Sequence, residues 1–427
     1  GIDCGADCSE AYTQGARVPL SAAPTIGYQF SGWNGACSGT GACSVAMNAA
    51  ATVGATFTAI TTPTCANGGV LYDTNGTNGF GRQYAVNSAQ VSAPTDIAFI
   101  PGSATAFVVI DQSGYVNYFN GGCDRINRVD IRTTLGVVSG GEQGLLNVEF
   151  HPDYATNGYV FFYHTTVAST VNSVTRMSVT FNAGGNLVLS NPQRIIDFRK
   201  ADTAAASNHN GGGLVFAPDQ TLLASIGDGG ADSNSAQADG RLLGKVIRVQ
   251  PSLAAGAGGY TIPAGNMFAA TNPPCSNVAV NAQPCPEILA KGLRNPFRMA
   301  RDSDVIYLGD VGSGTEEVNS FVVTNNTANF GWPTHDGFVV SSTLPGYRNP
   351  IVYYTRSGAA ATLNAFRSED PMATVTTSAS VMIGDVYRGS RYTAAMNGGA
   401  LLFGEFYNGF VRAVGVDASG NITDGDG

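Results

Sequence analysis

The sequence predicts an all-β protein, a β-propeller preceded by a small N-terminal β module. The 427-residue chain contains 55 glycines and only 12% charged residues, a composition that favours a turn-rich β fold over a helical bundle. A unit of two apolar strands joined by a turn recurs from about residue 65, and no long segment shows the 3.6-residue period of a helix. Recurring strand pairs indicate four-stranded blades around a central channel, since a sandwich would have fewer strands and no such recurrence.

Residues 1–60 are predicted to form a separate unit of short strands. Val18, Leu20, Trp33 and Phe57 are among the apolar positions that alternate along the segment, and glycine turns separate them, as in strands joined by tight turns. A core this small is weak alone, and disulfides would stiffen it. The segment GIDCGADCSEAYTQGARVPLSAAPTIGYQFSGWNGACSGTGAC resembles the divergent InlB-type repeat of bacterial surface and secreted proteins. The resemblance implies a spacer or adhesive module without chemistry of its own.

Residues 61–64, Thr-Thr-Pro-Thr, are predicted to be a linker, and residues 65–427 the propeller. Strand pairs are expected in DIAFIPGSATAFVVIDQSG, NVEFHPDYATNGYVFFYH, GLVFAPDQTLLASIGDGG, RMARDSDVIYLGDVGSG and, more loosely, GALLFGEFYNGFVRAVGVDASG. The insertion from about Ala254 to Glu287 is expected to be a long loop held by a crosslink, because long loops without strands of their own are otherwise functional or disordered.

The eight cysteines favour disulfides over metal binding. Six of them are close in sequence, as Cys4/Cys8, Cys37/Cys43 and Cys275/Cys285, which leaves Cys65 and Cys123. Zinc would favour C-x-x-C pairs or a nearby histidine, and none of the four histidines lies near a cysteine pair. Disulfides form in oxidising compartments, so we expect a secreted, periplasmic or cell-surface protein. The start at Gly1-Ile2-Asp3-Cys4 suggests a processed chain.

The charge balance excludes several classes of partner. The formal net charge is −9, and only Lys200, Lys245 and Lys291 are lysines. Nucleic-acid binding is not expected, because it needs clustered basic residues. Membrane insertion is not expected either, because no apolar run approaches the ~20 residues that span a bilayer.

A set of motifs carries a specific resemblance. From about residue 83 to 417 the chain contains, in this order, GGEQGLLNVEFHPDYATNGYVFF, SNHNGGGLVFAPDQTLLASIGDGG, RLLGKVIRVQP, KGLRNPFRM, GDVGSGTEEVN and NFGWPTHDG. Together they resemble the soluble quinoprotein glucose/sorbosone dehydrogenase family, six-bladed propellers that include aldose sugar dehydrogenases. The later segment GDVYRGSRYTAAMNGGALLFGEF resembles a branch that also contains hedgehog-interacting-type propellers, whose members are not all shown to be enzymes.

The resemblance implies a catalytic histidine and a quinone site. His209 in SNHNG would be the general base that takes the anomeric hydroxyl proton of a sugar as hydride passes to pyrroloquinoline quinone (PQQ), a role suited to imidazole near neutral pH. Arg294, Asn295, Glu142 and Asn208 would contact the cofactor, with the Arg294 charge stabilising the quinone oxygen as hydride arrives. A lone loop histidine is more often held structurally, and Arg294 could equally pair with a carboxylate. A one-residue register error would replace Glu142 by Gln143.

The resemblance also implies calcium, the hard cation that prefers oxygen ligands. The backbone carbonyls of Val311 and Gly312 would bind the ion that anchors the quinone, and Glu317 with the carbonyl of Phe330 would bind a second one. The alternative is an acidic, solvated loop between blades. Asp228 with Asp232 could form another ligand group, but a cap on a turn is the favoured role of Asp228. His151, Asp153, His164 and His335 are expected to be structural.

Two departures from the family weaken the expected cofactor site. Tyr407 stands where the family's dehydrogenases place a lysine against a cofactor carboxylate. The chain also stops before the strands that carry further cofactor-binding arginines in the family. PQQ is a tricarboxylate, and each lost charge-assisted hydrogen bond would cost about 1.5–3 kcal/mol. The last blade of the six would then be incomplete, with an open sheet edge that invites pairing.

Two hypotheses follow. The first is an extracellular or periplasmic PQQ- and calcium-dependent dehydrogenase that oxidises the C1 hydroxyl of an aldose, a small sugar substrate, to a lactone. The second is a non-catalytic, calcium-binding propeller that serves as a binding or structural subunit, through self-association or within a larger extracellular assembly. A glycosidase is not expected, because no pair of carboxylates lies at recognisable glycosidase positions.

Overall fold

The computed structural model describes residues 9–423 except 21, 23–27, 41–42, 60–70, 73–80, 83–89, 104, 121–123, 167–169, 201–206, 269, 326, 357–377, 390–398 and 408–410. Contacts divide the chain into a small N-terminal unit, Gly1–Thr64 with Gly389–Ala395, and a main unit, Cys65–Arg388 with Met396–Gly427. The expected linker and Cys4, Cys8, Cys65 and Cys123 lie outside the described residues. None of the helices in the described part of the chain has the length and apolar character needed to cross a membrane.

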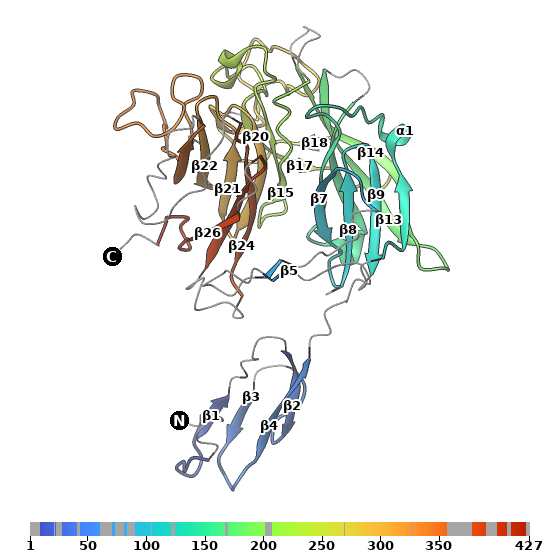
Figure 1. Cartoon of the computed structure of the whole chain (residues 1–427), viewed down its shortest axis with the longest axis vertical. Helices are drawn as coiled ribbons and strands as arrows, with labels where there is room; N and C mark the ends of the chain where they lie inside the picture. The colour runs from blue at the N-terminus through green and yellow to red at the C-terminus, as the bar shows by residue number, and fades with distance from the viewer. Residues whose placement is uncertain are drawn as a thin grey trace. The chain divides into compact units, whose positions relative to one another are not determined.

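The N-terminal unit is built from two antiparallel strand pairs (Figure 1). β1 (Arg17–Leu20) pairs with β3 (Cys43–Ala46), and β2 (Tyr28–Gly35) pairs with β4 (Val53–Ala59). The expected disulfide between Cys37 and Cys43 is present, with 5.8 Å between the Cα atoms. Cys43 is buried, so the crosslink lies in the small core and replaces part of the apolar packing that so short a unit lacks.

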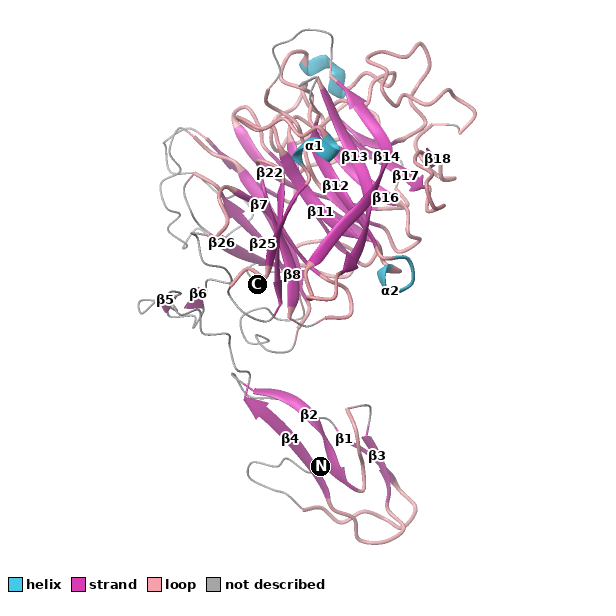
Figure 2. Ribbon diagram, turned by 90° about the vertical axis from the view of Figure 1, so that its right-hand side faces the viewer, coloured by secondary structure: helices cyan, strands magenta, loops and turns pink. Residues whose placement is uncertain are grey.

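The main unit consists of consecutive antiparallel sheets, as the recurring strand pairs predicted (Figures 1 and 2). The first two sheets are β7 (Pro94–Phe99), β8 (Ala106–Asp111), β9 (Tyr115–Asn120), β10 (Asn127–Asp130), and then β11 (Leu145–Phe150), β12 (Tyr159–Thr165), β13 (Val171–Phe181), β14 (Leu187–Arg199). The third contains β15 (Leu214–Phe216), β16 (Leu222–Ile226), β17 (Lys245–Pro251), β18 (Tyr260–Thr261) and β19 (Ile288–Lys291). The last two are β20 (Pro296–Asp302), β21 (Val305–Asp310), β22 (Thr315–Val322), β23 (Val352–Thr355), and then β24 (Val381–Tyr387), β25 (Ala400–Glu405), β26 (Val411–Gly415). The short helical segments are α1 (Arg132–Leu135), α2 (Tyr154–Asn157) and the 3-10 turn η1 (Ser233–Ala236).

The first strands of successive sheets contact one another in chain order: β7 with β11, β11 with β15, β15 with β20, and β20 with β24. This is the arrangement of propeller blades, whose innermost strands surround the axis. Apolar side chains fill the space between neighbouring sheets. Phe161 of β12 and Phe216 of β15, for example, meet edge to face with ring centroids 5.1 Å apart.

The expectation of six blades is wrong for the described residues, which form five blade-like sheets. Between residue 65 and β7 the described strands are only β5 (Leu71–Tyr72) and β6 (Gly81–Arg82), a two-residue pair too short to form a blade. The last sheet, β24–β26, has three described strands where its predecessor has four. The blade count depended on the family resemblance, whereas the strand pairs themselves followed from the apolar pattern.

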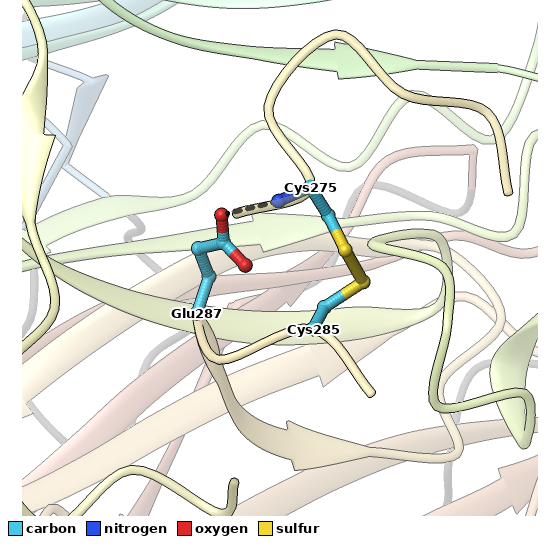
Figure 3. Close-up of side chains that lie close together, drawn as sticks. All are labelled: Cys275, Cys285 and Glu287. Carbon is cyan, nitrogen blue, oxygen red and sulfur yellow. Dashed lines mark hydrogen bonds between the residues drawn. A yellow bond between two sulfur atoms is a disulfide. The ribbon is translucent and has the colours of Figure 1, made fainter. Parts of the chain in front are cut away.

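The insertion between β17 and β19 is held by the expected disulfide. Cys275 and Cys285 are bonded, fully buried, and 5.5 Å apart at Cα. Glu287 lies beside them (Figure 3), and its Oε1 accepts hydrogen bonds from the Cys275 N–H at 2.8 Å and the Tyr260 hydroxyl at 2.5 Å. Both sulfur atoms are in the disulfide, so they are not thiolate ligands and this cluster is structural.

Candidate functional site

A cavity of about 790 Å³ opens at one end of the main unit. It brings together seven of the expected site residues, namely Glu142, Asn208, His209, Arg294, Asn295, Val311 and Tyr407. Gly312, Glu317 and Phe330 are not among the described residues that line it. In an antiparallel blade the entry to the first strand and the exits of the second and fourth strands lie at the same end. Residues from these loops, distant in sequence, therefore converge on one cavity.

The turn that carries His209 depends on two glycines. His209 has a φ of 51°, and Gly211 has a φ of 66°, left-handed values that are easiest for glycine. A Cβ atom at Gly227, just after β16, would lie 2.2 Å from the His209 carbonyl oxygen. The motif SNHNGGG, followed by SIGDGG, thus lets the turn before β15 lie directly against the exit of β16.

Asp228 is the direct partner of His209, a pairing that was not predicted from the sequence. Its Oδ1 lies 2.6 Å from His209 Nδ1 and also accepts the Gly230 N–H at 2.8 Å, while Oδ2 accepts the Trp332 indole N–H at 2.9 Å. Burial raises the pKa of Asp228, but the hydrogen bond and charge interaction with His209 and the other donors outweigh burial and hold the pKa below its usual value. Asp228 therefore caps the expected turn and also orients the imidazole.

Glu142 links the histidine turn to Asn295. Its Oε2 accepts the His209 backbone N–H at 2.6 Å and the Asn295 side-chain amide at 3.1 Å. The Asn295 Oδ1 in turn accepts the Gly211 N–H at 3.0 Å. Glu142 lines the cavity, whereas the neighbouring Gln143 is buried and outside the lining. These bonds fix the cavity wall around His209.

Three arginines are among the described residues that line the cavity, and only Arg294 of these was predicted. The Arg294 Nη1 donates to the Val311 carbonyl at 2.8 Å, and its guanidinium lies 5.6 Å from the Trp332 ring centroid. Arg298 is buried and donates to the carbonyls of Phe297 and Thr95. Arg298 belongs to the KGLRNPFRM motif. The alternation of side chains along the strand that follows Arg294 was the sequence signal that could have predicted its place in the cavity wall.

The third arginine, Arg356, bears on the calcium expectation. Its Nη1 donates to the Gly312 carbonyl at 2.7 Å, just as Arg294 donates to Val311. Both carbonyls expected to bind the first calcium thus accept a hydrogen bond from a cationic guanidinium. A divalent ion at the same oxygens would lie within a few ångströms of two positive charges. The carbonyl pair, as arranged here, does not fit calcium.

The second expected calcium site has a buried carboxylate. Glu317 pairs in register with Asp310 across β21 and β22. Its Oε1 accepts the Gly337 N–H at 2.5 Å, and its Oε2 accepts the Asn319 amide at 3.0 Å. Burial, reinforced by the neighbouring Asp310, raises the pKa of Glu317 to about 8. Phe330, expected to supply the carbonyl, is buried, and its N–H donates to the Lys291 carbonyl.

The other histidines make local contacts away from the cavity lining. His151 Nδ1 lies 2.9 Å from the Asn157 side-chain amide, His164 Nε2 lies 3.0 Å from the Thr175 hydroxyl, and His335 Nε2 lies 2.8 Å from the Ser342 hydroxyl. Tyr407 lies at the cavity, is 61% exposed as a residue, and has its ring edge-on to that of Phe406.

Comparison with known proteins agrees with this architecture. Residues 4–61 match a family model described as Divergent InlB B-repeat domain. The structure of the PQQ-bound form of aldose sugar dehydrogenase from Streptomyces coelicolor has a similar fold, with a TM-score of 0.56, 20% identity, and coverage of 80% of this chain and 81% of that one. The apo-form of the soluble aldose sugar dehydrogenase from Escherichia coli gives a TM-score of 0.55 at 20% identity, covering 78% and 86%.

The proteins that are related in sequence align with smaller parts of this chain than the solved structures do. The HIPL2 protein of Arabidopsis thaliana is 38% identical over 154 residues, 32% of this chain and 20% of the relative. Aldose sugar dehydrogenase YliI of E. coli strain K12 is 22% identical over 65% of this chain and 71% of the relative. The chain thus matches about a fifth of the length of the HIPL2 protein. A family model described as Glucose / Sorbosone dehydrogenase matches residues 91–399, more than half of the chain, and the chain therefore belongs to the glucose/sorbosone dehydrogenase family.

Proposed function

We propose that this chain is a PQQ-dependent dehydrogenase that oxidises the C1 hydroxyl of an aldose to a lactone. The observation that carries the proposal is the His209–Asp228 pair in a cavity lined by arginines. A base for the hydroxyl proton and positive charge for an anionic cofactor are the two things this oxidation needs from the protein.

The cavity suits PQQ in size and charge. A volume of about 790 Å³ is within the range of sites for cofactor-sized ligands. Arg294, Arg298 and Arg356 supply cationic donors for a tricarboxylate, while Glu142 is already engaged by His209 and Asn295. When bound, PQQ would accept the hydride that leaves C1. Asn208, Asn295 and Tyr407 lie in the same lining and would contact the cofactor or the sugar.

His209 would take up the hydroxyl proton. Asp228 lies against Nδ1, and an Nδ1–H donated to this carboxylate leaves the lone pair on Nε2. Nε2 would accept the proton as the C1–H bond breaks, and Asp228 would stabilise the resulting imidazolium. C1 thereby loses a hydride to the cofactor and its hydroxyl oxygen loses a proton to His209, which together are the two-electron oxidation of a hemiacetal to a lactone.

The proposal includes no step through calcium at Val311 and Gly312, because their carbonyls accept hydrogen bonds from arginines. Calcium remains part of the proposal only at Glu317 and the Phe330 carbonyl, where a cation would neutralise the Asp310 and Glu317 carboxylates. Two disulfides support a location outside the cytoplasm, in the periplasm, in the medium or at the bacterial surface.

A non-catalytic binding or structural subunit is the second candidate. It is favoured by Tyr407, an exposed aromatic residue at the position where the family resemblance leads one to expect a cofactor-binding lysine. Such a subunit would act through self-association or within an extracellular assembly, and sedimentation at several protein concentrations tests it directly.

The decisive experiment is reconstitution with PQQ, with and without CaCl2, followed by sugar-driven dye reduction. We expect activity in the wild type and a loss of at least about 100-fold in His209→Ala, because general-base catalysis contributes about 10²–10⁴-fold. His335→Ala is the matched control, since His335 lies outside the cavity lining. An inactive wild type, or a fully active His209→Ala, would contradict the proposal.

A further inference from the structure

Arg356 is held at the cavity by its backbone and by its side chain. It directly follows β23, and its N–H donates to the Gly314 carbonyl at 2.9 Å. The guanidinium Nη1 donates to the Gly312 carbonyl at 2.7 Å, and Nη2 donates to the Ala379 carbonyl at 2.5 Å. The side chain thus bridges the turn after β21 and the segment that enters β24.

A buried acidic side chain also faces the guanidinium. Glu316 of β22 is fully buried, and its Oε1 lies 3.2 Å from Arg356 Nε. The Glu316 Oε2 accepts the Val381 N–H at 2.8 Å, so the carboxylate itself is fixed from the β24 side. Arg356 keeps 23% of its side chain exposed and is part of the cavity lining. The Arg356 guanidinium is therefore held by contacts within the protein while the residue still lines the cavity.

The guanidinium retains capacity for a ligand. It has five N–H donors. Its hydrogen bonds to described residues use one hydrogen on each of Nη1 and Nη2, and Nε faces Glu316 Oε1 at 3.2 Å as an ion pair without hydrogen-bond geometry. Beyond these contacts, each terminal nitrogen has a second N–H within the planar fork of the guanidinium. A carboxylate group matches such a fork, and charge-assisted bonds of this kind are stronger than neutral ones.

We propose that Arg356 binds a carboxylate of the cofactor and provides, at the Gly312 carbonyl, the positive charge that calcium would otherwise provide. This inference rests on the proposed function, because PQQ is the polycarboxylate concerned. The Arg356 charge would compensate in part for the cofactor-binding lysine that Tyr407 replaces. It also makes cofactor binding at this wall independent of a divalent ion.

Equilibrium dialysis of PQQ against the full chain, in EDTA and in CaCl2, tests the inference without any turnover. The wild type should bind PQQ with similar affinity in both buffers. Arg356→Gln should bind about 10- to 100-fold more weakly in EDTA, the effect of losing charge-assisted hydrogen bonds. Part of this loss should be recovered in CaCl2, because the Gly312 carbonyl is then free. Arg132→Gln removes the same charge on α1, away from the cavity lining, and should match the wild type.

Folding of the variants is checked by circular dichroism and thermal melts. Arg356→Gln leaves Glu316 buried without its partner, so the double variant Arg356→Gln/Glu316→Gln gives a neutral pair and should show the same weakened binding. Wild-type binding that requires CaCl2, or unchanged affinity in folded Arg356 variants, would overturn this inference and leave the proposed function in place. No PQQ binding by the wild type in either buffer would overturn both.

Discussion

At the scale of single residues, the site is a chain of polar contacts around His209. Glu142, 67 residues earlier, holds its backbone N–H, and Asp228, 19 residues later, holds its ring. Trp332 holds Asp228 in turn. Each contact restricts the position or the orientation of the imidazole ring, so the base would be positioned before the substrate arrives.

Asp228→Asn should disable the base while leaving the cofactor site intact. An amide cannot stabilise the imidazolium that forms on proton uptake, so we expect kcat to fall about 100-fold or more with little change in KM. PQQ affinity from dialysis and the melting temperature serve as controls and should stay close to wild type, because Asp228 is outside the cavity lining. A parallel loss of PQQ affinity would mean that Asp228 only supports the fold.

His164 should make the main unit sensitive to acid. Its side chain is fully buried on β12, and burial lowers its pKa to about 3. As the pH falls below about 6.5, His164 is therefore protonated in the unfolded chain but stays neutral in the folded protein. The free energy of unfolding is therefore unaffected by this group above about pH 6.5 and falls as the pH is lowered towards 3. The loss is about 3 kcal/mol at pH 4.

The test of this effect is urea unfolding of the wild type and His164→Gln between pH 7 and pH 4. Gln can keep the hydrogen bond to Thr175 but does not titrate. The variant should lose less stability over this range, and the difference at pH 7 corrects for altered packing. Equal losses in both proteins would show that His164 is protonated in the folded state.

At the scale of elements, the strand pairs could be predicted because their apolar runs and turn residues are local signals. The convergence of Glu142, His209 and Asn295 was predictable only through the resemblance, since 153 residues separate Glu142 from Asn295. Arg356 was not predicted, because its partner Gly312 lies 44 residues away and backbone carbonyls leave no trace in sequence. Asp228 was assigned a turn role alone, since its second contact is made in the tertiary structure.

Gly227→Ala should displace the His209 turn from the exit of β16. The new methyl group would lie 2.2 Å from the His209 carbonyl oxygen and 3.1 Å from Asn295 Oδ1. Overpacking of this kind costs about 1–3 kcal/mol, and we expect dye reduction to fall by far more than the melting temperature would suggest. Gly184→Ala in the β13–β14 turn is the matched control, because its nearest contact is 3.4 Å. Full activity in Gly227→Ala would show that the turn adapts without moving the base.

At the scale of the whole molecule, the propeller places short loops from several blades around one cavity. The repeated apolar pattern predicted the blades but not their number, because it does not distinguish strands of different sheets. The described residues that line the cavity lie between Ala93 and Tyr407, all in the main unit. The proposed chemistry would therefore belong to the main unit alone.

Removal of residues 1–64 tests this division. The contacts group residues 1–64 with Gly389–Ala395, apart from the main unit, and no described residue of residues 1–64 lines the cavity. The chain from Cys65 to Gly427 should keep its melting temperature and its affinity for PQQ, since each unit has its own core. Thermal melts and dialysis of the truncated and full chains in one buffer measure both quantities. A truncated chain that folds but binds PQQ more weakly would show that the N-terminal unit supports the site, and the proposed boundary at residues 61–64 would then be wrong in function.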